Sequence, residues 1–330
     1  MAAGRDGRHW ICHAGRPRYL ALIMTDLILH HYPTSPFSEK VRVAFGIKRL
    51  SWRSVHIPNI MPKPELMPLT GGYRRTPVLQ IGADVYCDTQ LIMLELEKRA
   101  PQPSLLAAGQ AGEARALAMW ADRAIFWPAV GVVMGAIADK LPEAFHKDRS
   151  EFSGRPFDAT RLKAAAPAAR DQTYAQLALA EAMLADGRPF LIGGSPTLAD
   201  CALYNPVWFL KERLGAGRAV PPLDRLPGVV AWSERMKAFG NGSPAAMTAA
   251  QALDVARAAA PLPSEVDRAD PSGLAAGQEV SVTPDDTGRV PVTGVLVGLT
   301  PDRVSVRRSD PGVGDIVVHF PRAGFVISAL

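Results

Sequence analysis

The hydrophobic pattern between residues 25 and 101 alternates short apolar runs with longer amphipathic stretches. The short runs predict four strands, at residues 27–32, 52–57, 77–81 and 84–86. Apolar residues that recur every three or four positions predict three helices, at residues 36–48, 62–69 and 88–99. Ser35 is a suitable N-cap for the first of these helices, and Pro36 suits its first helical position.

The order of these elements, β-α-β-α-β-β-α, is the thioredoxin-like arrangement. We therefore expect residues 25–101 to form a thioredoxin-like domain. After a linker rich in Pro, Ala and Gly, residues 111–240 carry helical patterns throughout and predict an all-helical domain. Within it, Thr197-Leu198-Ala199-Asp200 has the form of a capping box, because a hydroxyl stands at the N-cap and an acid three residues later.

The pattern changes again after residue 240. Residues 241–276 are rich in Ala, Pro, Ser and Gly and predict one more helix followed by a linker. In residues 277–330, valines and isoleucines alternate with polar residues between turns. This pattern predicts about five short strands that close into a small SH3-like β-barrel. Because so small a unit is near the lower limit for an independent core, we expect it to dock on the helical domain or on a second subunit.

Residues 1–24 do not belong to this pattern. They are rich in arginine, and their apolar run at residues 19–23 is too short for the core of a signal peptide. We expect a disordered tail or an over-long gene prediction, with Met24 as the natural start and residues 1–23 not necessarily expressed. An organellar targeting segment is the alternative.

Composition narrows the class of protein. With 48% hydrophobic and 21% charged residues, the chain has the balance of a soluble globular protein, and no apolar run reaches the roughly 18 residues that a membrane helix needs. A net charge of +5 over 330 residues is a mild excess, so we do not expect nucleic-acid binding. The cysteines Cys12, Cys87 and Cys201 lack metal-site spacing and cannot all pair. We therefore expect a cytoplasmic protein without a bound metal or a membrane contact.

Ser35-Pro36-Phe37-Ser38 occupies the turn where redox-active thioredoxin folds carry two cysteines. Without cysteine this turn cannot perform dithiol exchange. The free N–H groups and the dipole at the helix start can still hold the thiolate of another molecule, with a serine hydroxyl as donor. Lowering the pKa of a bound thiol by about two units takes roughly 2.7 kcal/mol, which one charge-assisted hydrogen bond and the helix end can supply. The alternative is that Ser35 only caps the helix.

Two further motifs follow along the chain. Pro77 stands at the start of the predicted hairpin, and we expect the peptide bond between Thr76 and Pro77 to be cis. A cis peptide here would expose the backbone of Thr76 to a peptide-like ligand. The alternative is an ordinary proline at a strand start. Asp88-Thr89 opens the next helix, where the backbone and the Thr89 hydroxyl suit a carboxylate and Asp88 suits an ammonium. The alternative for this pair is simple capping.

In this order and at these intervals, the motifs resemble the glutathione S-transferase family, and within it the omega class. The matching segments are Ser35-Pro36-Phe37, Lys63-Pro64-Glu65, Thr76-Pro77, Asp88-Thr89 and the capping box at residues 197–200. The resemblance covers about residues 26–240. It implies that Ser35 handles the thiol of glutathione, that Lys63 meets its glycine carboxylate, and that Thr76 holds its cysteinyl backbone. By the same resemblance Asp88 and Thr89 bind the γ-glutamyl end, and Phe37, Arg75 and Pro77 complete the glutathione site.

The chain departs from the omega pattern where serine replaces cysteine and Asp-Thr replaces Glu-Ser, so the thiol-transferase activity of that class is not expected. Thr34, Ser38 and Tyr32 are rival donors to the thiol. Five aromatic residues could line an apolar co-substrate pocket or belong to the core: Trp120, Phe126, Trp127, Trp208 and Phe209.

The resemblance implies a homodimeric detoxification enzyme in which glutathione, the co-substrate, attacks an apolar electrophile. The alternative is a non-catalytic scaffold that binds a protein partner through residues 277–330.

Overall fold

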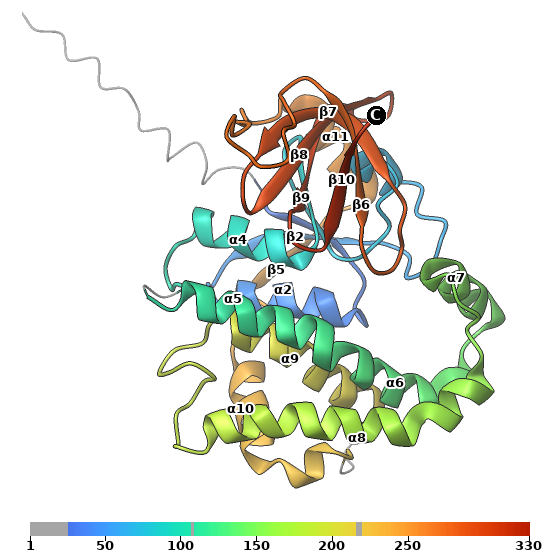
Figure 1. The fold of residues 1–330 in the computed structure, drawn as a ribbon, viewed down its shortest axis with the longest axis vertical. Helices are drawn as coiled ribbons and strands as arrows, with labels where there is room; N and C mark the ends of the chain where they lie inside the picture. Colours follow the sequence, from blue (N-terminus) through green and yellow to red (C-terminus); the bar gives the residue numbers. More distant parts are fainter. Residues whose placement is uncertain (1–25, 107–108, 216–219) are drawn as a thin grey trace, which may run out of the picture.

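The computed structural model describes residues 26–106, 109–215 and 220–330. The expectations for residues 1–24 and the position of Cys12 lie outside this range. The described chain confirms the predicted fold class: a thioredoxin-like part, an all-helical part, and a small β module near the C-terminus (Figure 1).

The thioredoxin-like part follows the predicted order of elements. These are β1 (Ile28–His31), α2 (Pro36–Ile47), β2 (Ser51–His56), α3 (Met67–Thr70), β3 (Val78–Ile81), β4 (Asp84–Cys87) and α4 (Thr89–Arg99). Strand β1 pairs with β2 in parallel and with β3 in antiparallel orientation, and β4 follows β3 as a hairpin around Gly82. Helix α2 begins where the sequence predicts, because the Ser35 side chain accepts a hydrogen bond from the Ser38 amide at 3.2 Å and Pro36 follows the cap.

Helices form the second part of the molecule. They are α5 (Ala111–Trp120), a π-helical turn η1 (Ala121–Ile125), α6 (Phe126–Ile137), the 3₁₀ turn η2 (Ala138–Lys140), α7 (Glu143–Ser153), α8 (Ala159–Leu184), α9 (Leu198–Leu210), the π-helical turn η3 (Lys211–Gly215), the 3₁₀ turn η4 (Leu223–Arg225) and α10 (Pro227–Ala238). The predicted capping box opens α9, where the Asp200 carboxylate accepts from the Thr197 amide at 2.8 Å. The same carboxylate accepts from Trp232 Nε1 at 2.9 Å, so the cap also fastens α10 to α9.

The continuous helical run Ala111–Lys140 is long and apolar enough to cross a membrane by length and composition. Its residues Ala118, Ile125, Ala129 and Val133 are buried in the main hydrophobic cluster of the molecule. Packing against the neighbouring helices therefore accounts for the apolar residues on this face of the run.

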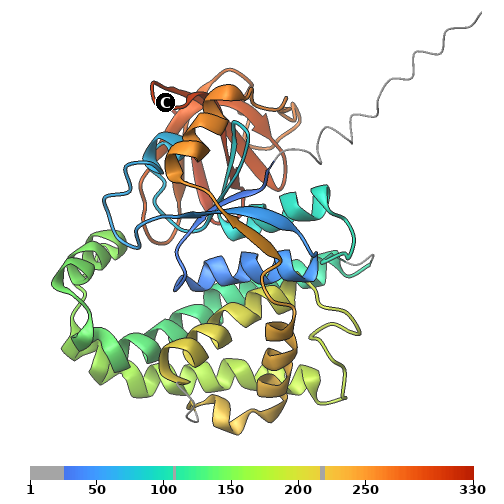
Figure 2. The same cartoon turned by 180° about the vertical axis from the view of Figure 1, so that it is seen from behind.

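Strands that follow the helical part extend the thioredoxin-like sheet at both of its edges. The β module consists of β6 (Glu279–Pro284), β7 (Val292–Leu299), β8 (Arg303–Asp310), β9 (Gly314–Pro321) and β10 (Phe325–Ala329). Strand β9 pairs in parallel with β4, so that all strands join one sheet in the order β10-β6-β7-β8-β9-β4-β3-β1-β2-β5. The other edge strand, β5 (Ser243–Ala246), pairs with β2 and was not predicted. The helix predicted after it is α11 (Ala249–Ala258), which lies beside the module (Figure 2).

A buried polar chain fixes the β module to the thioredoxin-like sheet. His319 Nε2 lies 2.8 Å from the Asp84 carboxylate, and His319 Nδ1 lies 2.8 Å from the Ser305 hydroxyl. The imidazole also stacks on Tyr86 with ring centroids 4.5 Å apart. Burial lowers the pKa of His319, although the Asp84 carboxylate acts in the opposite direction. The module thus docks foremost on the thioredoxin-like part, whereas the sequence suggested the helical domain or a second subunit.

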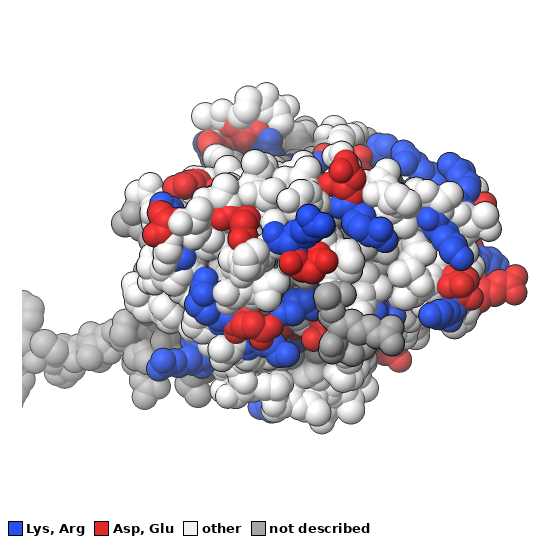
Figure 3. All heavy atoms as spheres, turned by 90° about the horizontal axis from the view of Figure 1, so that it is seen from below, with Lys and Arg blue, Asp and Glu red and all other residues white. Residues whose placement is uncertain are grey.

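Charged side chains of both signs are scattered among uncharged residues on the face of the molecule seen from below in Figure 3. Lys and Arg residues lie interspersed with Asp and Glu residues there, and no single-signed stripe crosses that face.

Candidate functional site

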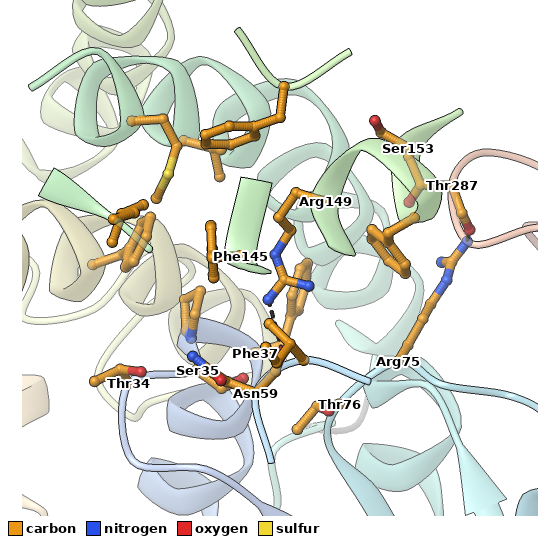
Figure 4. A pocket seen from close by; sticks show the side chains of 18 of the residues that line it. Thr34, Ser35, Phe37, Asn59, Arg75, Thr76, Phe145, Arg149, Ser153 and Thr287 are labelled. Atoms are coloured by element: carbon orange, nitrogen blue, oxygen red, sulfur yellow. Dashed lines mark hydrogen bonds between the residues drawn. The ribbon is translucent and has the colours of Figure 1, made fainter. Parts of the chain in front are cut away.

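A pocket of about 630 Å³ lies between the thioredoxin-like part and the helical part. The turn before α2, the segment 59–63 and the segment 74–76 form one wall, and α6 and α7 form the facing wall (Figure 4). Thr287 from the β module closes part of the rim. Three units of the chain therefore meet at one cavity.

Ser35 stands at the bottom of the pocket, at the N-terminus of α2. The residue is 2% exposed, its hydroxyl oxygen accepts the Ser38 amide, and its hydroxyl also interacts with the phenol of Tyr32. Thr34 and Tyr32 line the same pocket, and burial raises the pKa of Tyr32, so its phenol keeps its proton. Ser38 is fully buried and does not line the pocket, and its hydroxyl has no hydrogen-bond partner among the described residues.

Lys63 and Thr76 lie together on the same wall of the pocket as Ser35. Lys63 Nζ donates to the Arg74 carbonyl and to the Thr76 hydroxyl, each at 3.0 Å. Burial lowers the pKa of Lys63 to about 8, and the charges of Arg149 and Arg74 act in the same direction. The Thr76–Pro77 peptide is cis. Lys63 therefore supports the segment 74–76 that lines the pocket, and its two hydrogen bonds leave one of its three N–H groups for a further acceptor.

Phe37 and Arg75 extend the pocket in opposite directions. Phe37 packs on Phe126 of α6 with ring centroids 4.4 Å apart, and so joins the first turn of α2 to the helical wall. Arg75 turns toward the β module, where its guanidinium donates to the Asp286 carboxylate and to the Thr287 carbonyl. The only pocket-lining residue of the module, Thr287, is thus held in place by a residue of the predicted glutathione site.

Asp88 and Thr89 lie outside the open pocket. Asp88 caps α4 with φ 71°, and its carboxylate accepts the Gln90 amide at 2.9 Å. The Thr89 hydroxyl accepts from Lys40 Nζ at 3.1 Å, and Lys40 also pairs with Asp122 at 2.6 Å. The structure therefore brings Ser35, Phe37, Lys63, Arg75 and Thr76 to one cavity, and Asp88 and Thr89 are not among the residues that line it.

Sequence models of the glutathione S-transferase N-terminal and C-terminal domains match residues 29–104 and 163–235. A crystal structure of a GST-like protein from Pseudomonas syringae is 38% identical to this chain, with a TM-score of 0.74. That alignment covers 92% of this chain and 100% of the other. The chain belongs to the glutathione S-transferase family. Because the alignment is so extensive, it must include much of the β module as well.

Two weaker similarities concern proteins of Caulobacter. FtsZ-localized protein A from Caulobacter vibrioides is 32% identical over 100 residues, which are 29% of this chain and 44% of that protein. The match therefore spans less than half the length of this relative. The structure of FzlA from C. crescentus is 25% identical, covers 64% of this chain and 88% of that chain, and gives a TM-score of 0.50.

Several pocket residues of this transferase fold had no motif in the sequence. Arg149 of α7 lies over the face of Phe145 at 4.5 Å and donates to the Asn59 carbonyl at 2.9 Å (Figure 4). Asp148 accepts the Met61 amide at 2.8 Å and pairs with both Arg149 and Arg74. The i, i+4 spacing of Phe145 and Arg149 is the only local signal, and it is also common on ordinary surface helices.

The predicted aromatic candidates divide between the pocket and the core. Phe126, Trp127 and Phe209 line the pocket. Trp120 instead donates to Gln176 at 2.8 Å, and Trp208 lies under the guanidinium of Arg42.

Other reactive groups of the described chain lie away from the site. Within the residues that the structure describes, no three His, Cys, Asp or Glu side chains gather as a metal site would require. Cys87 and Cys201 are buried, and burial raises the pKa of each thiol. Both are therefore packing residues with little thiolate character.

Proposed function

We propose that this chain binds glutathione and activates its thiolate for attack on an electrophilic small molecule. The observation that supports the proposal best is the placement of Ser35, Lys63 and Thr76 around one end of a large pocket whose other end is lined with aromatic residues. One end offers polar groups to a peptide, and the other offers an apolar surface to a second reactant.

In the proposed mechanism, the sulfur of glutathione lies against the N-terminus of α2. The Ser35 hydroxyl donates to the thiolate, and the helix dipole favours the negative charge. Thr76 pairs through its backbone with the cysteinyl unit, and Lys63 faces the glycine carboxylate. The sulfur then forms a bond to the electrophilic carbon, and the leaving group departs with the bonding electron pair. Catalysis here is positioning and electrostatic stabilisation, without a covalent enzyme intermediate.

Asp88 and Thr89 are proposed to bind the γ-glutamyl end. The Thr89 hydroxyl accepts from Lys40, so its own hydrogen can be donated to a carboxylate. Asp88 supplies the countercharge for the α-ammonium group. Entry of the ligand requires displacement of the contact between Gln90 and the Ala323 carbonyl, at 3.4 Å, which lies beside this end.

The decisive experiment combines a binding and a turnover measurement. Calorimetry with glutathione should show binding, and a thiol-conjugation assay with an activated aryl halide should show turnover. Absence of glutathione binding would refute the enzyme proposal. Binding without turnover would favour the second candidate function, a non-catalytic scaffold whose β module binds a protein partner. The partial similarity to FtsZ-localized protein A supports that candidate.

We also propose a cytoplasmic homodimer with a role in detoxification, as the family resemblance implies. Within one chain the β module already joins the thioredoxin-like sheet to the helical part, through Arg115 with Asp302 and Arg123 with Asp285. A dimer must therefore form on surfaces that the module leaves free. Light scattering at micromolar concentration tests this state.

A further inference from the structure

Among the described residues, the charged side chains that line the pocket are all of one sign. Its lining includes six cationic side chains, and none of the described residues that line it is acidic. The cationic residues are Lys63, Arg74, Arg75, Arg149, Arg155 and Arg213. Clefts lined by one sign of charge concentrate the field and attract ligands of the opposite sign.

Neighbouring carboxylates offset only part of this charge. Asp148 is shared by Arg74 and Arg149, and Asp286 pairs with Arg75. Two of the six positive charges are thereby balanced, and four remain. The pKa of Lys63, lowered to about 8, still leaves most of this residue charged at neutral pH.

Glutathione alone does not balance the remainder. In its thiolate form it carries two carboxylates, one thiolate and one ammonium, and therefore a net charge of about −2. Two positive charges of the pocket would still lack a counterion after it binds. The second reactant must then supply negative charge, or the cations must stay solvated.

Arg213 is the cation best placed to meet that second charge. It lies in η3, directly after α9, and is partly buried, whereas Arg155 is exposed and more strongly screened by solvent. Among the residues that the structure describes, the Arg213 side chain has neither an ion pair nor a hydrogen bond, although it lines the pocket. Aromatic rings line the same pocket, among them Phe126, Trp127 and Phe209.

We propose that the electrophilic co-substrate is an aromatic molecule that carries a carboxylate or an equivalent oxyanion, and that Arg213 binds this group. This inference rests on the proposed function and specifies the class of its second substrate. A planar guanidinium binds a carboxylate through two parallel hydrogen bonds, while the aromatic wall receives the ring. Arg213 would thereby select anionic over neutral electrophiles of the same shape.

A matched pair of probes tests the selection: 4-chloro-3,5-dinitrobenzoate and its methyl ester. In both reactions the glutathione sulfur bonds to the ring carbon that bears chlorine, and chloride leaves with the bonding electron pair. Each kcat/KM is divided by the uncatalysed rate constant, because the ester is the more reactive electrophile. The normalised value should be about tenfold higher for the acid. In Arg213→Gln the ratio of acid to ester should fall to about one. Arg161→Gln, an exposed arginine of α8 outside the pocket, should keep the parent ratio.

A binding measurement keeps the inference testable if the chain does not catalyse conjugation. With S-methylglutathione, which cannot react, quenching of tryptophan fluorescence reports probe binding, since Trp127 lines the pocket. The acid should bind about tenfold more tightly than the ester, and Arg213→Gln should remove the difference. Turnover of both probes with equal normalised rates, or equal affinity for acid and ester, overturns the inference while the transferase proposal stands. Preferential binding of the acid without turnover of either probe overturns the transferase proposal alone.

Discussion

At the scale of single residues, the Ser35 hydroxyl is the donor on which activation of the thiol is expected to depend. Ser35→Ala should lower kcat/KM for conjugation by about ten- to a thousandfold, because one preorganised donor to the sulfur is lost. The dissociation constant of glutathione should change far less. Ser38→Ala is the matched control, since Ser38 lies outside the pocket. If Ser35→Ala keeps full turnover while Tyr32→Phe or Thr34→Val abolishes it, another donor activates the thiol.

Sequence motifs located the side of the pocket that belongs to the thioredoxin-like part. Ser35 and Thr76 stand next to prolines in local patterns, and such patterns depend only on neighbouring residues. Arg149 and Arg213 have no such pattern, because they reach the pocket through the packing of α7 and η3. Asp88, which the sequence assigned to a ligand or to a cap, is in the structure the cap of α4.

At the scale of elements, the contact between β4 and β9 depends on a buried carboxylate. Asp84 accepts from His319 Nε2 and also from the Leu262 amide at 2.9 Å. Asp84→Ala leaves the buried His319 Nε2 without its partner and removes the acceptor of the Leu262 amide, so the free energy of unfolding should fall by about 2–4 kcal/mol. Asp302→Ala removes only an exposed ion pair with Arg115 and should cost about 0–1 kcal/mol. Urea unfolding of both variants measures the difference. Equal losses of unfolding free energy would show that the buried hydrogen bonds of Asp84 stabilise the fold no more than an exposed ion pair does.

Elements could be predicted from the sequence where they depend on a local residue pattern. They could not be predicted where only pairing with a distant strand makes a segment a strand. The four strands and the helices α2 and α4 follow from apolar periodicity and capping residues, whereas the helix predicted at residues 62–69 is only the four-residue α3, Met67–Thr70. Strand β5, Ser243–Ala246, is exposed along its length and has no alternation, so only its pairing with β2 makes it a strand. The parallel contact of β9 with β4 joins segments more than 200 residues apart and likewise left no local signal.

At the scale of the whole molecule, buried histidines make stability depend on pH. Burial lowers the pKa of His30 to about 4 and, together with the charge of Arg42, that of His31 to about 3; burial also lowers that of His319. The unfolded chain binds protons near pH 6.5, where the folded chain does not, so this stability is present above pH 6.5 and is lost as pH falls. His30 and His31 together should lose about 2.7 kcal/mol between pH 7.5 and pH 5.5, at about 1.4 kcal/mol for each, and His319 acts in the same direction. Urea unfolding across that range measures it, and a flat profile would show that these rings are protonated in the folded chain.

Removal of the β module should destabilise the rest of the molecule. A chain that ends at residue 276 loses the partner strand of β4 and uncovers Tyr73, Val78 and Val85, which share one buried cluster with the module. Tyr73 alone loses ring contacts with Phe320 and Phe325 at 5.6 and 6.3 Å. Exposure of three large side chains costs about 5–9 kcal/mol, which is comparable to the whole stability of a typical domain.

We therefore expect the truncated chain to be insoluble, or to unfold at least 10 °C below the full chain in a thermal scan. Asp286→Ala is the control, because it removes only the ion pair with Arg75 at the pocket rim and keeps the sheet intact. It therefore distinguishes the loss of the sheet from the loss of this single contact. Its unfolding temperature should stay within a few degrees of that of the full chain. A truncated chain that unfolds like the full one would mean that the module is a tethered unit and that the continuous sheet contributes little to stability.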